Sequence, residues 1–211
     1  MISRKISVLV LLTLSFLENV YACAFDDIAP NEITVWRAYY HNDLERAQES
    51  LGTMLEKLYR IQNVKDVLPL YAKAVMAFGQ APQDTPKEVY DETVLPLLTA
   101  AFEEMRKTSP YTFEAHLLAA AELKWWVARR NPEECSPDKI ALMMAQVYAL
   151  LYGGTPKNYE RATLWRAYAA NVRDQFQDTL KEVREEDWSK LQEMLTWSYE
   201  DLEKSLQRLR Q

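Results

Sequence analysis

The sequence predicts an all-α fold, and three of its features support this prediction. From residue 25 onward the chain holds 22 Leu and 21 Ala but only 10 Val and 4 Ile. Leu and Ala favour helices, whereas β-branched residues favour strands. No segment alternates apolar and polar residues with a period of two, and the whole chain contains only 4 Gly. Helices joined by short loops without a sheet form either a bundle or a stack of antiparallel helical hairpins.

Capping residues and prolines divide the chain after residue 25 into seven or eight helices. Asn31, Asn42 and Asn63 precede segments with helical periodicity, while Thr85 and Ser136 each precede a proline that suits the first turn of a helix. Pro96 is expected to kink the fourth helix, and the largely apolar fifth helix is expected to be central. The expected helices span 31–41, 42–62, 63–79, 86–109, 110–130, 137–153, a segment from 156, and 186–211.

Residues 1–24 predict an export signal ahead of a single helical domain at 25–211. Arg4 and Lys5 precede an apolar run of signal-peptide length, which is too short to span a membrane. Ala22 and Ala24 form the small-x-small pattern that a signal peptidase reads, so we expect cleavage after Ala24 and a periplasmic or secreted product. Cleavage before Cys23, with a lipid on that cysteine, is the alternative.

Composition argues against several classes of function. The formal charge of −6 disfavours a nucleic-acid binder, and the scarcity of glycine disfavours a phosphate-binding loop. His41 and His116 belong to no ligand-spaced pair, so no metal or other cofactor is expected; His116 is expected in the core or a groove. Cys135 is expected to be a surface-loop thiol. The pair Glu49-Ser50 occurs in lytic transglycosylases, but the rest of their motif is missing here, so no catalytic residue is expected.

One window has a distinctive helical pattern. Gly153-Gly154-Thr155-Pro156 precedes Tyr159, Ala162, Trp165, Ala169 and Ala170, in which small residues allow close helix approach and rings fill the space between turns. This window resembles one unit of the Sel1-like group of tetratricopeptide-type repeats. The resemblance covers about 30 residues and does not recur upstream at the repeat period, so an irregular helical bundle stays open. Trp165 is expected to be buried against Ala145 or Tyr148.

Aromatic side chains accompany arginines at two places, and these are the candidate binding residues. Trp, Tyr and Arg are enriched at binding surfaces, although large residues also simply fill helical cores. Neighbouring Trp residues on a helix point about 100° apart, so we expect one of the adjacent pair to be exposed. The candidates are Trp36, Arg37 and Tyr40 in the first helix, and Trp125, Trp126, Arg129 and Arg130 in the fifth.

These observations predict an exported, non-catalytic protein that binds a protein or peptide of the cell envelope. A small-molecule-binding accessory protein of an envelope transporter is the first alternative, and a cell-wall hydrolase is the second. An open apolar groove would favour the first function. An enclosed aromatic pocket would favour the accessory protein, and two carboxylates facing each other across a cleft would favour the hydrolase.

Overall fold

A computed structural model describes residues 25–131, 135–180 and 183–211, and within these ranges the chain forms helices and no strands. The predicted all-α fold class is therefore confirmed. The predicted export signal at 1–24 lies outside the described residues. The helices are α2 (Ile28–Tyr40), α3 (Leu44–Tyr59), α4 (Val64–Gln80), α5 (Lys87–Thr93), α6 (Leu95–Arg106), α7 (Ala115–Arg129), α8 (Pro137–Tyr152), a 3₁₀ turn (Pro156–Asn158), α9 (Glu160–Leu180) and α10 (Glu185–Arg208).

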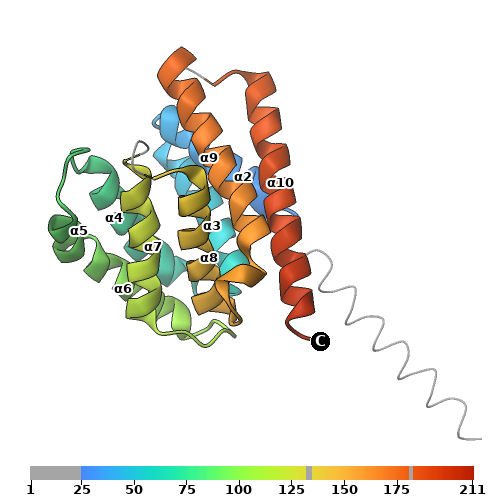
Figure 1. The fold of residues 1–211 in the computed structure, drawn as a ribbon. Coiled ribbons are helices and arrows are strands. Elements are labelled where there is room, and N and C mark those ends of the chain that lie inside the picture. Colours follow the sequence, from blue (N-terminus) through green and yellow to red (C-terminus); the bar gives the residue numbers. More distant parts are fainter. Residues whose placement is uncertain (1–24, 132–134, 181–182) are drawn as a thin grey trace, which may run out of the picture.

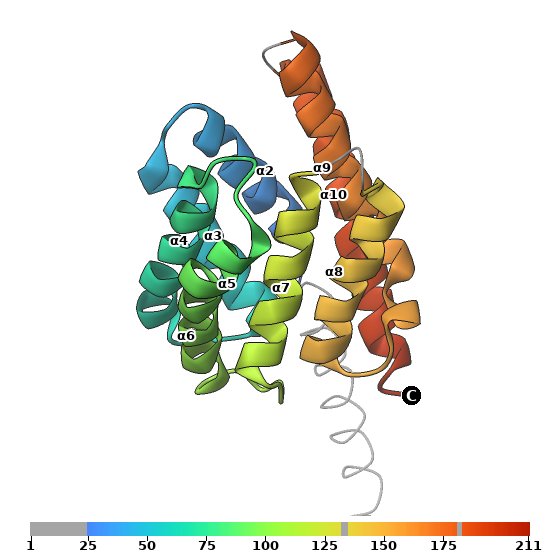
Figure 2. The same cartoon turned by 60° about the vertical axis from the view of Figure 1, so that its left-hand side comes forward.

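The helices pack side by side in chain order and close on themselves. Each of α2, α3, α4, α6, α7, α8, α9 and α10 packs against the next, and α10 returns to pack against α2, while the short α5 lies on α6 (Figure 1). We call this arrangement the helix ring. In both views the end of α9 and the start of α10 extend beyond the other helices (Figure 2). The contact between α10 and α2 joins the last helix to the first, in addition to the packing of each helix on its neighbour in the chain.

Most expected boundaries hold, and three differ for identifiable reasons. Helix α2 begins before Asn31, whose amide donates to the Asp27 carbonyl at 2.7 Å instead of capping. The expected helix at 86–109 is two helices that meet at Val94, because Pro96 lacks the N–H needed to continue α5. Helix α7 begins at Ala115 rather than near 110, where the Ser109 hydroxyl donates to the Tyr59 carbonyl and ties the preceding loop to α3.

The turn between α8 and α9 depends on its glycines. Gly153 and Gly154 have φ angles of +86° and +77°, a conformation that L side chains rarely adopt. A Cβ atom on Gly154 would lie 2.9 Å from Oδ1 of Asn158. That oxygen accepts hydrogen bonds from the backbone N–H and the hydroxyl of Thr155 at 2.8 and 2.9 Å. The turn therefore sets the close antiparallel course of the two helices.

In the repeat-like window the small residues Ala162, Ala169 and Ala170 are buried as expected, but Trp165 is not. Tyr159 is fully buried, and its ring contacts Tyr148 of α8 at a centroid distance of 5.9 Å. Trp165 is only half-buried, and its ring packs on Trp197 of α10 at 4.8 Å. The expectation that Trp165 is buried against α8 is therefore wrong. The inward position next to it on the helix is taken by Arg166.

Two single-residue expectations are also wrong. Cys135, expected in a surface loop, is buried; its backbone N–H donates to the Asn131 carbonyl, and it lines a hollow together with Ile140 of α8 and Ala167 of α9. His116, expected in the core or a groove, is exposed in the first turn of α7, whose inward positions are Ala115, Leu118 and Ala119.

Candidate functional site

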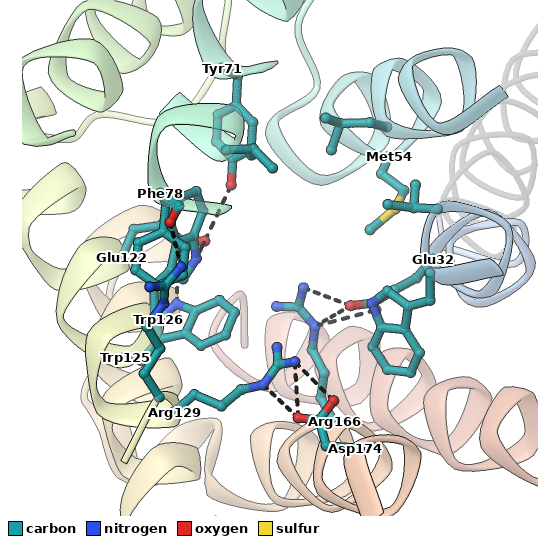
Figure 3. A pocket seen from close by; sticks show the side chains of 15 residues that line it. Glu32, Met54, Tyr71, Phe78, Glu122, Trp125, Trp126, Arg129, Arg166 and Asp174 are labelled. Atoms are coloured by element: carbon teal, nitrogen blue, oxygen red, sulfur yellow. Dashed lines mark hydrogen bonds and ion pairs between the residues drawn. The ribbon is translucent and has the colours of Figure 1, made fainter. Parts of the chain in front are cut away.

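A pocket of about 360 Å³ lies inside the helix ring, partly open to solvent (Figure 3). Its lining comes from α2, α3, α4, α7 and α9, which are far apart in the sequence. Its volume is at the lower end of the range of small-molecule sites. The apolar and aromatic lining residues are Val35, Trp36, Leu51, Met54, Tyr71, Val75, Phe78, Trp125 and Trp126, and the charged ones are Glu32, Glu122, Arg129, Arg130, Arg166 and Asp174.

Glu122 organises the aromatic side of the pocket. Its two carboxylate oxygens accept hydrogen bonds from the indole nitrogens of Trp125 and Trp126 at 3.0 and 3.1 Å, and from the Tyr71 hydroxyl at 3.3 Å. The spacing of Glu122, Trp125 and Trp126 puts all three side chains within one turn of α7. Burial raises the pKa of the Glu122 carboxyl above its ordinary value, although its three donors and Arg166 oppose this shift.

Both tryptophans of the adjacent pair are buried, so the expectation that one is exposed is wrong. Trp126 packs against Tyr71 and Phe78 of α4 at centroid distances of 6.0 and 5.3 Å. The Trp125 ring lies 5.7 Å from the guanidinium carbon of Arg166. Because α7 is flanked by α6 and α8 within the ring, both directions lead into the protein interior.

Glu32 and Arg166 form a buried ion pair on the opposite side of the pocket. The closest contact, at 2.8 Å, joins a terminal guanidinium nitrogen to Oε1 of Glu32, and the Tyr199 hydroxyl donates to Oε2 at 2.5 Å. The side chains of Arg166 and Glu32 are 16% and 4% exposed, so this charge pair is largely shielded from water. Attraction to Glu32 raises the already high pKa of Arg166, against the opposing effect of burial.

Arg129 pairs with Asp174 between the pocket and a second hollow of about 370 Å³. The guanidinium donates to both carboxylate oxygens, at distances between 3.0 and 3.3 Å. Asp174 also accepts from Arg173 at 2.9 Å, and burial raises the pKa of its carboxyl. The second hollow is lined in addition by Tyr40 and Cys135.

Arg130 lines the pocket but has a structural task. It donates to the carbonyls of Ala81 and Pro82 at 2.7 and 2.9 Å and to the Phe78 carbonyl, and it lies 4.1 Å above the Phe78 ring. Its hydrogen bond to the Tyr90 hydroxyl is 2.8 Å long. These carbonyls are at the C-terminal end of α4, where cations are favoured. Arg130 thus fastens α7 to α4 and α5.

The N-terminal candidates separate in the structure. Trp36 lines the pocket, and the guanidinium carbon of Arg173 lies 4.4 Å from the centre of its ring. Arg37 points instead to α10, where it pairs with Glu185 and lies 5.4 Å from the Trp188 ring. Tyr40 packs beside Trp188 and borders the second hollow. The pocket therefore joins Trp36 with Trp125, Trp126 and Arg129 but leaves out Arg37 and Tyr40.

Sequence reasoning missed Glu32, Glu122 and Arg166, the buried charges of the pocket. Glu122 had a detectable signal, because it interrupts the apolar face of α7 one turn before the tryptophans. Arg166 and Glu32 also fall at apolar-periodic positions of their helices. Their mutual pairing across 134 residues has no counterpart in local sequence.

Comparisons of the chain with protein-family models, with curated proteins and with solved structures find no match. Within the described ranges, no helix combines the length and apolar character that a membrane crossing requires. In the same ranges, His, Cys, Asp and Glu side chains form no group of three suited to a metal ion. The pocket contains an aromatic surface, the guanidinium groups of Arg129 and Arg166, each paired with an acid, and the buried carboxyl of Glu122.

Proposed function

We propose that this is an exported, non-catalytic binding protein that holds a small organic molecule in the pocket of the helix ring. The observation that carries this proposal is the convergence of Trp36, Tyr71, Phe78, Trp125 and Trp126 with a few buried polar groups in one cavity. Mostly apolar pockets with few, fixed polar groups are typical of small-molecule sites. A role as accessory protein to an envelope transporter is consistent with such a site.

The pocket is built before any ligand arrives. Hydrogen bonds to Glu122 fix both indole rings, and the Glu32–Arg166 pair fixes the opposite wall. A site whose side chains are already ordered loses little conformational entropy on binding. This pre-organisation favours a binding role over a loose interior gap.

The hydrolase alternative has one observation in its favour, because Glu32 and Glu122 enter the same pocket from α2 and α7. All four of their oxygens, however, accept hydrogen bonds or ion pairs from protein groups. A general acid or base must be able to exchange a proton with substrate or water. The arrangement thus supports binding better than catalysis.

A second candidate function is docking to an envelope protein or peptide. Leu142 of α8 and Leu164 and Tyr168 of α9 are large side chains that are 53%, 38% and 38% exposed. Exposed apolar side chains on neighbouring helices are a common feature of protein contacts. This face and the pocket belong to different sides of α9, so the two functions are compatible.

The test is a titration with N-phenyl-1-naphthylamine, an uncharged probe whose fluorescence rises in apolar sites. We expect saturable binding with a stoichiometry of one. Val75→Trp should abolish it by filling the pocket, whereas Val89→Trp, at an exposed position of α5, should not. Melting curves of both variants check folding. Absence of binding, or binding that is equal in the two variants, would refute the proposed function.

A further inference from the structure

We infer that the ligand of the pocket is an organic anion, whose acidic group binds between Arg166 and Arg129 while its apolar body lies on the tryptophan side. This inference rests on the proposed function and adds the chemical class of the ligand. It follows from which hydrogen-bonding groups of the pocket are already engaged and which remain available.

The acceptors of the pocket are engaged. Glu122 accepts three hydrogen bonds, and Glu32 accepts from Arg166 and Tyr199. Asp174 accepts from Arg129 and Arg173. Glu122 accepts three of the about four hydrogen bonds that a carboxylate can take. An ammonium group, with three N–H donors, would therefore leave most of its donors unpaired or displace a protein donor from one of these carboxylates.

Donors, by contrast, remain available. A guanidinium carries five N–H groups, and the bonds to Glu32 and Asp174 use only Nε and one terminal nitrogen of Arg166 and Arg129. In Figure 3 the other terminal nitrogen of each arginine has no dashed line to the residues drawn, and that of Arg166 points into the cavity. A carboxylate, sulfonate or phosphate is the natural acceptor for such donors.

A further polar group lies near Arg166. The hydroxyl of Tyr148 is buried, and within the described part of the chain it makes no hydrogen bond of ordinary geometry. Arg166 opposes the rise in the Tyr148 pKa that burial causes, both through its charge and through a hydrogen bond to the Tyr148 oxygen, so its guanidinium lies beside this hydroxyl. Arg166 can donate to the Tyr148 oxygen, but the buried O–H still needs an acceptor, which a water or a bound acceptor beside Arg166 would supply.

The balance of charge also favours an anion. Arg129, Arg130 and Arg166 line the pocket together with three acids, Glu32, Glu122 and Asp174. Arg173 adds a further positive charge beside Trp36, so guanidinium groups outnumber carboxylates around the cavity. The aromatic rings across from the arginines supply the contact surface for the apolar part of the ligand (Figure 3).

A matched pair of probes tests the inference. 8-Anilino-1-naphthalenesulfonate has the same ring system as N-phenyl-1-naphthylamine and adds one sulfonate. Partitioning alone favours the uncharged probe, so tighter binding of the sulfonate reports a polar contact. We expect the sulfonate to bind about tenfold more tightly or better, as one or more charged hydrogen bonds would give.

Two variants locate that contact. Arg129→Gln leaves Asp174 paired with Arg173, and the double change Glu32→Gln with Arg166→Gln removes an ion pair without stranding a charge. Each should reduce the preference for the sulfonate over the uncharged probe about tenfold. This ratio of the two affinities is the quantity compared with the unchanged protein.

The outcomes separate the two proposals. If the uncharged probe binds in the pocket but the sulfonate binds no better, or keeps its advantage in both variants, the inferred anion is wrong and the proposed function stands. If neither probe is excluded by Val75→Trp, the proposed function itself fails, and the inference fails with it.

Discussion

At the scale of single residues, Glu122 shows how one side chain sets the shape of a site. Its carboxylate joins Tyr71 of α4 to Trp125 and Trp126 of α7. Without this acceptor, two indole N–H groups would be buried without partners. The cost of burying the carboxylate is reflected in its raised pKa.

Glu122 should make stability depend on pH in a predictable direction. A carboxyl whose pKa is raised on folding stabilises the native state below its unfolded pKa, and loses that contribution as pH rises through the native pKa. Glu122→Gln lacks this titration. We therefore expect the unfolding free energy of the unchanged protein, minus that of the variant, to decrease from pH 4.5 to pH 8 in urea titrations. A difference that grows with pH would contradict the assignment.

Arg130 should matter for stability rather than for recognition. Arg130→Ala removes hydrogen bonds to three carbonyls and the contact with the Phe78 ring, so we expect a loss of about 2–3 kcal/mol. Arg46→Ala, at an exposed position in the first turn of α3, is the matched control and should change stability by less than about 0.5 kcal/mol. Equal melting temperatures for the two variants would show that Arg130 does not hold α7 to α4.

At the scale of elements, α9 has two different faces: one carries arginines into the interior of the ring, and the other packs an aromatic ring on α10. Ala162, Arg166, Ala169 and Arg173 recur at helical spacing and face the ring, whereas Trp165 packs outward on α10. Small residues let α8 and α10 approach α9 closely, and the two arginines bring charge to the interior.

Tyr159 and Trp165, two aromatic residues of the repeat-like window at 153–170, should differ in their contribution to stability. Tyr159→Ala removes a fully buried ring and should cost about 3–5 kcal/mol. Trp165→Ala removes a half-buried ring paired with Trp197 and should cost about 1–2 kcal/mol. Denaturant unfolding of both variants measures the ordering, and a larger loss at Trp165 would contradict the packing described for α9.

At the scale of the whole molecule, closure of the ring is what brings Glu32 to Arg166. Helix α10, at the C-terminal end of the chain, packs against both α9 and the N-terminal helix α2. It also supplies Tyr199, whose hydroxyl reaches Glu32. The pocket therefore depends on the last helix, although α10 contributes none of its lining residues.

Removal of α10 tests this dependence. A chain that ends at Arg184 would expose the apolar surfaces of α2 and α9, so we expect it to lose its cooperative thermal transition and its binding of the uncharged probe. Deletion of only Arg210 and Gln211, which are exposed, should leave both intact. A cooperative transition in the shorter chain would show that the ring does not need closure.

Export is a further prediction about the whole chain. Mass spectrometry of the protein purified from an expressing bacterium should find Phe25 at the amino terminus, because Ala22 and Ala24 form the small-x-small pattern that a signal peptidase reads. Phe25 is buried, and its carbonyl accepts a hydrogen bond from Ile28 at 3.0 Å. Ala24→Arg should block cleavage. Retention of Met1, or a diacylglyceryl group on Cys23, would contradict this prediction.

The sequence by itself determined the fold class and most of the helices. Asn63 and Ser136 precede helix starts at Val64 and Pro137 as predicted, although neither side chain makes a capping hydrogen bond. Pro137 suits the first turn of α8 because a proline has no N–H to leave unpaired there. Four residues of the pocket could also be identified from the sequence, because aromatic and charged residues stand out on apolar helices: Trp36, Trp125, Trp126 and Arg129. Their roles could not be predicted, and Trp125 and Trp126 are both buried.

Only the tertiary structure decided which of these residues meet and what they do. The partners of Glu122 on α4, of Arg166 on α2 and of Arg130 at the end of α4 are separated from them by tens of residues or more. Helical periodicity fixes the face on which a residue lies, but it carries no information about which helix will face it. The packing of the whole chain decides this, and the contact between α10 and α2 closes the ring around the pocket.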